Sequence, residues 1–173
     1  LGNNPMSLRC DWSPNGFHAL ILNGHQTVNL HPVNLGNNEI YTSYFGSDIQ
    51  QQETQCLTNE IHKINPGEAR IAGPLVSVGP TLRTYRIAIA TTWEYSNSFG
   101  SGTNAGTVAS LNTWLNAANA VYERELAVHL NLVNDTDIFY TTERGFTAST
   151  DPFTNSNVGA MLSEVRPVLR DQV

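Results

Sequence analysis

A long amphipathic pattern between two short apolar segments constrains the fold of this chain most. Over residues 104–125, apolar residues recur at the spacing of one helix face, and polar residues take the other. The expected core face comprises Val108, Leu111, Leu115, Ala118 and Tyr122, and the expected polar face Asn112, Asn116, Asn119 and Glu123. Strand-length apolar segments at 85–92 and 128–132 flank this helix. The order predicts a βαβ unit with two parallel strands and a right-handed crossover.

The segment before this unit predicts antiparallel strands. Residues 17–22 and 25–31 read as two strands joined by a turn at Asn23-Gly24, because both residues tolerate the positive φ of a tight hairpin turn. Residues 39–45 contain isoleucine, tyrosine and phenylalanine and predict a third strand. The expected fold class is therefore α+β, with a small antiparallel meander followed by an incomplete α/β unit.

Proline and glycine punctuate the stretch between these two parts, which is typical of a linker. We therefore divide the chain into a β-rich domain at 1–58, a linker at 59–80 and an α/β portion at 81–173. Residues 158–172 predict a last helix, which Pro167 should kink or divide. Two parallel strands alone make a poor domain, so we expect further chain or a partner to complete the sheet.

Charge and hydropathy exclude several classes of function. The net charge is −6 and Lys63 is the only lysine, so no basic stripe is available for phosphate groups and nucleic-acid binding is not expected. The longest apolar runs are far short of the ~20 residues that span a bilayer, so we expect no membrane insertion. The polar, asparagine-rich and lysine-poor composition is typical of a secreted, extracellular protein.

The motifs of the α/β portion resemble a known family. Residues 82–95 (LRTYRIAIATTWEY) resemble the opening strand of secreted bacterial reprolysin-like metallopeptidases, which are metzincins. Residues 116–126 (NAANAVYEREL) resemble the first long helix of that family, and the residues at 132–135 and 150–155 resemble the end of its second strand and the following loop. Arg9-Cys10-Asp11 and the PNGFHA segment after it are similar to the β-rich pro-region that precedes the peptidase domain.

The resemblance implies zinc chemistry for the full-length parent but not for this chain. The hallmark of the family is HExxH with a third histidine, in which two histidines one turn apart bind zinc and the glutamate is the general base. The five histidines are His18, His25, His31, His62 and His129, and no two are four residues apart. We therefore assign no catalytic and no cofactor-binding residue. The expected function is a non-catalytic N-terminal fragment of a zymogen, which supplies scaffold and latency and has the remainder of the peptidase domain as its partner.

Two cysteines carry alternative interpretations. Cys10 and Cys56 could form a disulfide across the meander, as an oxidising compartment favours, or remain buried thiols. Cys56 could also act as a latency thiol, because in related zymogens a pro-region thiolate occupies the open zinc position. A metal site of His25, His31 and Cys56 is a weaker alternative, since their spacing matches no standard pattern.

Oxygen-bearing side chains gather in the loop after the second parallel strand. The calcium candidates are Asp135, Asp137, Asp151 and Asn155, since carboxylate and amide oxygens are the ligands of calcium. The alternative is that they are ordinary turn residues, which Asp and Asn commonly are.

Some other residues have simple structural interpretations. The three tryptophans are expected in the core, Glu94 is expected as a helix cap or surface residue, and residues 123–125 are expected at a solvated helix end. The tryptophans are Trp12, Trp93 and Trp114.

A rival function is a secreted structural module without peptidase activity. An unfinished sheet has an open edge, which allows self-assembly or binding of a partner by strand addition, with residues 1–8 as a candidate donor strand. A third hypothesis, a carbohydrate- or calcium-binding β module, explains the meander but not the βαβ unit.

Overall fold

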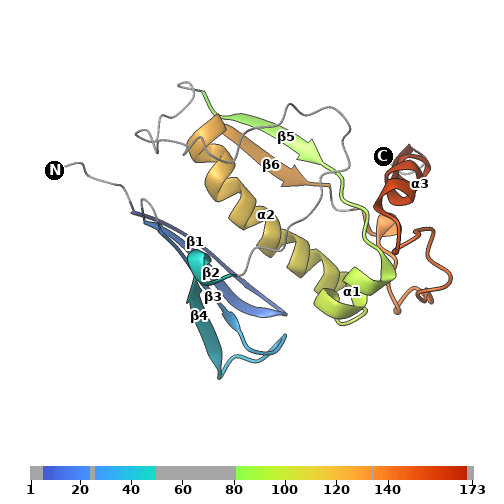
Figure 1. Cartoon of the computed structure of the whole chain (residues 1–173), viewed down its shortest axis with the longest axis horizontal. Coiled ribbons are helices and arrows are strands. Elements are labelled where there is room, and N and C mark those ends of the chain that lie inside the picture. Colours follow the sequence, from blue (N-terminus) through green and yellow to red (C-terminus); the bar gives the residue numbers. More distant parts are fainter. Residues whose placement is uncertain (1–5, 24–25, 50–80, 134, 171–173) are drawn as a thin grey trace.

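The computed structural model describes residues 6–23, 26–49, 81–133 and 135–170. One long helix, α2 (Asn104–Leu126), lies between two sheets (Figure 1). On one side is an antiparallel sheet in the order β1 (Met6–Ser13), β2 (Gly16–Asn23), β3 (Gln26–Pro32) and β4 (Tyr41–Phe45), followed by the 3-10 turn η1 (Gly46–Asp48). On the other side, β5 (Arg83–Ile87) runs parallel to β6 (Val128–Leu132). The predicted α+β fold is confirmed.

The remaining helices lie toward the N-terminal end of α2 (Figure 1). Helix α1 (Trp93–Gly100) precedes α2, while the 3-10 turn η2 (Thr136–Ile138) and helix α3 (Val158–Arg170) follow β6. Pro167 lies inside α3 and does not divide it, contrary to one expectation from the sequence. In the part of the chain that the structure describes, no helix is long and apolar enough to cross a membrane.

The antiparallel meander differs from its prediction in detail. Its first strand, β1, was not predicted as a separate element; it turns into β2 through residues 14–15, with Gly16 at a φ of +108°. Asn23 is the last residue of β2 and pairs with Gln26, so the prediction that Asn23 lies in the turn is wrong. Gly24 lies outside the described residues. The last strand begins at Tyr41, two residues later than expected.

The βαβ unit is confirmed, with one additional helix. The predicted strand at 85–92 ends as regular pairing at Ile87, and Thr91 makes a single parallel bridge with Phe139. Helix α1 begins immediately after it, capped by the Thr92 hydroxyl, which accepts a hydrogen bond from the Tyr95 amide (3.2 Å). Serine, asparagine and aromatic residues have only weak helix propensity, so the sequence of α1 alone does not predict a helix.

The core of this part forms where α2 crosses the residues that follow the strands. Leu111, Ile138 and Phe139 form the buried cluster, and Ala88 and Ala90 pack against it. These two small side chains follow β5 and allow α2 to lie close, as the sequence predicts. The prediction of a core position fails for Trp12 and Trp114, which are 70% and 55% exposed. Trp93 is half-buried, and its indole donates a hydrogen bond to Thr142 Oγ1 (2.9 Å).

The corner between α1 and α2 depends on two glycines in close contact. A methyl group at Gly106 would lie 2.2 Å from the carbonyl oxygen of Gly100, and one at Gly100 would lie 2.4 Å from Thr107 Oγ1. These separations are far below van der Waals contact. The two helices can therefore approach this closely only because Gly100 and Gly106 have no side chains.

We expect Gly106→Ala to destabilise the protein by at least about 2 kcal/mol, since the added methyl group forces the two helices apart. Urea unfolding followed by circular dichroism measures this loss. The matched control is Gly159→Ala in α3, where the added methyl group meets only the Asn157 side chain at 3.3 Å and stability should change by less than about 1 kcal/mol. Equal midpoints for the Gly106 variant and the wild type would contradict this packing.

Candidate functional site at the cleft between sheet and helices

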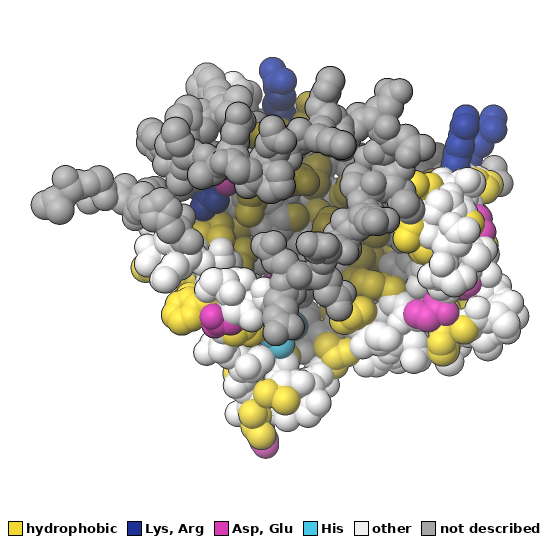
Figure 2. Space-filling view, viewed as in Figure 1, with side chains coloured by type: hydrophobic (Ala, Val, Ile, Leu, Met, Phe, Trp, Pro, Cys, Tyr) yellow, Lys and Arg dark blue, Asp and Glu magenta, His cyan; other side chains and the backbone are white. Residues whose placement is uncertain are grey.

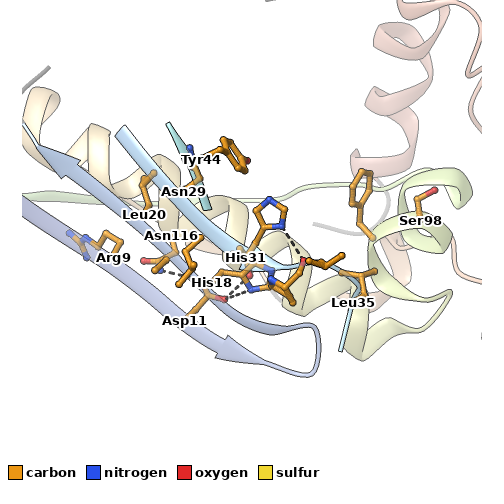
Figure 3. A pocket seen from close by; sticks show the side chains of 17 residues that line it. Arg9, Asp11, His18, Leu20, Asn29, His31, Leu35, Tyr44, Ser98 and Asn116 are labelled. Atoms are coloured by element: carbon orange, nitrogen blue, oxygen red, sulfur yellow. Dashed lines mark hydrogen bonds and ion pairs between the residues drawn. The ribbon is translucent and has the colours of Figure 1, made fainter. Parts of the chain in front are cut away.

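A cavity lies between the antiparallel sheet and the helices α1 and α2. It has a volume of about 410 Å³, and Figure 3 shows that the labelled side chains come from both sides. The polar residues that line it are Arg9, Asp11, His18, Asn29, His31, Tyr44, Ser98, Thr113 and Asn116. Apolar residues line it as well, among them Leu20, Leu35 and Phe99, so the sheet turns a mixed polar and apolar face toward α2.

Strand register places an aspartate and two histidines in one row of this cleft. Asp11 pairs with His18 across β1 and β2, and His31 lies on the same face of β3. The Asp11 carboxylate accepts hydrogen bonds from α2, from Thr113 Oγ1 at 2.6 Å and from Asn116 Nδ2 at 3.5 Å. His18 Nδ1 is buried 3.6 Å from Asp11 Oδ2, too far for a hydrogen bond. The row joins the sheet to the helix.

His31 does not take part in that row's contacts with the helix. Its Nδ1 lies 3.1 Å from the carbonyl oxygen of Pro32, and its ring meets Tyr44 edge-on at 5.4 Å between centroids. His25 and Cys56, the other members of the weaker metal hypothesis, lie outside the described residues. That hypothesis is therefore not tested.

A second set of polar contacts runs from the sheet through α2 to β6. Arg9 of β1 makes a hydrogen-bonded ion pair with Glu123 of α2. The second carboxylate oxygen of Glu123 lies 2.6 Å from His129 Nδ1 on β6, and His129 Nε2 lies 2.9 Å from Asn131 Oδ1. The expectation that Glu123 belongs to a solvated helix end is wrong, because its side chain is only 20% exposed and joins both sheets.

Asn119 also has a different role from the one predicted. It is 5% exposed, although its spacing assigns it to the polar face of the helix. Its amide donates to the carbonyl oxygen of Leu130 (2.9 Å) and accepts from the Leu130 amide (2.8 Å). Asn119 therefore satisfies both backbone groups of a β6 residue, as a neighbouring strand would. By contrast Tyr122, predicted for the core face, is 41% exposed.

Asn15 ties the meander to the α1–α2 corner. This residue is 5% exposed, and its Nδ2 donates to the carbonyl oxygens of Phe99 and Gly106, both at 3.1 Å. Phe99 lies in the last turn of α1, where the backbone carbonyl groups have no hydrogen-bond partner within the helix. One turn residue of the meander thus fixes the end of a helix.

The four calcium candidates are not brought together as a cation site. Asp137 pairs with Arg144 (3.2 Å), whose guanidinium also donates to the carbonyl oxygens of residues 136, 137 and 139, each at 2.8 Å. A cation thus already occupies this group of oxygens. Asp135 caps the turn η2 by accepting from the Asp137 amide (3.0 Å). The calcium interpretation is unsupported at these two residues.

The other two candidates stabilise helix α1. Asp151 accepts a hydrogen bond from the Trp93 amide (2.8 Å), and Asn155 donates to Glu94 in the first turn of the helix (2.6 Å). Glu94 lies in the first turn of α1, where a negative charge is favourable, while Thr92 is the capping residue. Near Asp151, burial raises the pKa of Tyr140, while the charge of Arg144 lowers it and that of Asp151 raises it. These aspartate and asparagine side chains therefore act within the fold.

Within the described ranges, the donor sets do not fit zinc. Among the described residues there is no group of three or more histidine, cysteine, aspartate or glutamate side chains that could hold a metal ion. Zinc in metallopeptidases needs three protein ligands around one open position, and no histidine pair of this sequence has the helical spacing that supplies two of them. No catalytic step through zinc can be built from these residues.

Cys10 lies exposed on β1, on the side away from α2. Its proposed partner Cys56 lies outside the described residues, and no disulfide is formed within the described part of the chain. Both the disulfide and the latency thiol therefore stay predictions.

Comparison with known proteins identifies the α/β portion. The family model of the reprolysin-like metallopeptidases of family M12B matches residues 81–167, about half of the chain. No curated protein and no solved structure gives a significant match. The matched segment begins just before β5 and ends within α3, so it contains the whole βαβ unit. This chain belongs to the reprolysin-like M12B metallopeptidase family.

Proposed function

We propose that this chain is the non-catalytic N-terminal part of a secreted zinc metallopeptidase precursor. Residues 81–167 supply the first scaffold elements of the peptidase domain, and the antiparallel sheet is a pro-region that docks on them. Zinc and its ligands belong to the remainder of that peptidase. The proposal is supported by the family match, which covers the βαβ unit and leaves out the sheet.

The observation that carries the pro-region role is the contact between the two parts. Arg9 and Asp11 of β1 reach Glu123 and Thr113 of α2, and α2 lies within the segment that matches the family. An ion pair and hydrogen bonds contribute to this contact beside apolar residues, and such partly polar interfaces resemble those between separable domains. A pro-region needs such an attachment, because it must hold during folding and release afterwards.

The same arrangement is the support for a proposed latency function. The sheet covers one side of α2 while β6 lies on the other, and Glu123 contacts both. Release of the sheet would remove Arg9 from Glu123 and leave His129 as its only partner among these residues. Loss of the pro-region would thereby change the charge balance along α2.

Strand addition is a second candidate function, and the open edge of β5 favours it. Among the described residues β5 pairs only with β6, and four of its five residues are exposed. The outer edge of β6 is less suitable, since Asn119 already occupies the backbone groups of Leu130. A partner strand would therefore pair with β5 rather than β6.

We predict that the purified chain binds much less than one zinc ion per molecule and does not cleave casein. Its residues offer no ligand set for catalytic zinc. Metal analysis after dialysis against micromolar zinc, together with a peptidase assay, tests the prediction. Stoichiometric zinc together with chelator-sensitive cleavage would contradict the non-catalytic role.

A double-mutant cycle tests the docking of the sheet. We expect Arg9→Met and Glu123→Gln to show a coupling of about 1 kcal/mol in the free energy of unfolding, because each removes the same ion pair. The control cycle uses Arg124 and Glu125, a pair at 2.9 Å whose partners are neighbours on α2 and do not reach the sheet. Its coupling should be near zero. If the two cycles give the same coupling, the Arg9–Glu123 pair does not hold the sheet.

A further inference from the structure

The anchoring residue Asn15 has a chemical reactivity beyond its structural role. It is followed by Gly16, and Asn-Gly pairs are especially prone to deamidation, because glycine has no side chain to hinder attack by its amide nitrogen. The chain has one other such pair, Asn23-Gly24. The two asparagines differ in their surroundings, since Asn15 is 5% exposed while Asn23 is exposed at the end of β2.

Deamidation of an Asn-Gly pair is a balanced reaction that needs only water. The backbone nitrogen of the glycine attacks the side-chain carbon Cγ, so that a C–N bond forms and the bond from Cγ to Nδ2 breaks. Ammonia leaves with the proton that the glycine nitrogen gives up, and a succinimide ring stays behind. Water then opens the ring at one of its two carbonyl carbons and gives aspartate or isoaspartate.

The docked sheet holds Asn15 away from this reaction. Ring closure requires rotation about the Cα–Cβ bond of Asn15, which would break the hydrogen bonds from Nδ2 to the carbonyl oxygens of Phe99 and Gly106, both 3.1 Å. It also requires rotation about the Cα–C bond. The hairpin pairing of Gly16 restrains this second rotation, as does the hydrogen bond that the Asn15 carbonyl oxygen accepts from the Gly36 amide (3.0 Å). Reaction therefore requires that the turn leave the α1–α2 corner, toward which the end of β1 points in Figure 1.

The product cannot make the contacts that Asn15 makes. A carboxylate accepts hydrogen bonds but does not donate them, so it would face the carbonyl oxygens of Phe99 and Gly106 without a hydrogen between them. None of the groups that are hydrogen-bonded to Asn15 is basic, and basic side chains are few on the face of the molecule that Figure 2 shows. The new charge would be buried and unpaired, which is strongly unfavourable.

We propose that Asn15 is a deamidation site that docking of the sheet protects, and that its conversion prevents the sheet from docking again. The change is permanent because the ammonia is lost. The protection follows from the contacts at the corner alone. The consequence, that deamidation makes release of the pro-region irreversible, rests on the proposed function. A native protein without zinc and without a partner fragment would remove that consequence and leave the protection unaffected.

Peptide mapping by mass spectrometry tests the protection on the full chain, incubated at mildly alkaline pH in buffer or in urea. Asn15 should convert at least about tenfold more slowly in the folded chain, since an opening that costs only about 1.4 kcal/mol already gives this factor. Asn23 is the internal reference, and its rate should differ less between the two conditions because it is exposed. Equal rates at Asn15 in the folded and the unfolded chain overturn the proposal.

A variant tests whether docking of the sheet is the source of the protection. Arg9→Met removes the ion pair with Glu123 and should raise the rate at Asn15 about threefold. The matched control is Glu125→Gln, which removes a pair within α2 and should leave the rate unchanged. Circular dichroism verifies that both variants are folded. A rate at Asn15 that is the same in Arg9→Met as in the wild type, or that rises equally in the control, overturns the role of docking.

Hydrogen exchange followed by mass spectrometry tests the effect of conversion. Asn15→Asp should raise the exchange rates of β1 and β2 at least about tenfold, and Asn15→Ala should raise them less, because it removes the same donors without adding a charge. Wild-type chain that has converted in urea and is then refolded gives a second measurement that needs no variant. A sheet that exchanges as slowly with aspartate at this position as in the unmodified chain overturns the claim that conversion prevents docking.

Discussion

Helix α2 is enclosed on two sides, and the rest of the structure depends on how its polar residues are satisfied there. A helix that lies between two sheets cannot keep a whole polar face in water, and buried polar groups need partners. Asn119 meets this need with the backbone of β6, and Thr113 meets it with Asp11 of the meander. Glu123 reaches both sides through Arg9 and His129. These contacts determine where each sheet lies.

The contact between the meander and α2 bears on the proposed pro-region role. Ion pairs and hydrogen bonds are easier to separate than an apolar core, which suits the pro-region role that we propose for the sheet. Apolar side chains take part as well, since Leu20 and Leu22 of β2 lie on the face toward α2 and Leu22 is only 6% exposed.

The sequence predicts the parts of this fold that local periodicity determines. The period of α2 and the apolar strands β5 and β6 are visible because each residue's neighbours along the chain carry the signal. The roles of Asn119 and Glu123 are not, since Asn119 bonds to the backbone of β6 and Glu123 also reaches the antiparallel sheet, and spacing along the helix reveals neither contact. The aspartates after β6 resemble a calcium loop by composition, and only the structure shows that Arg144 pairs with Asp137 and with the backbone carbonyl oxygens beside it. Helix α1 is not predicted from the sequence, because residues outside it stabilise it: Thr92 and Asp151 accept hydrogen bonds from the backbone amides of its first turn.

The intact mass of the native protein, with zinc measured on the same sample, tests the central claim most directly. The account predicts a mass well above the 19.0 kDa of this chain, or a co-purifying fragment that carries about one zinc ion, since the ligands that these residues lack must come from elsewhere. A native protein of 19.0 kDa without zinc and without a partner fragment would contradict the claim that this chain is part of a zinc metallopeptidase.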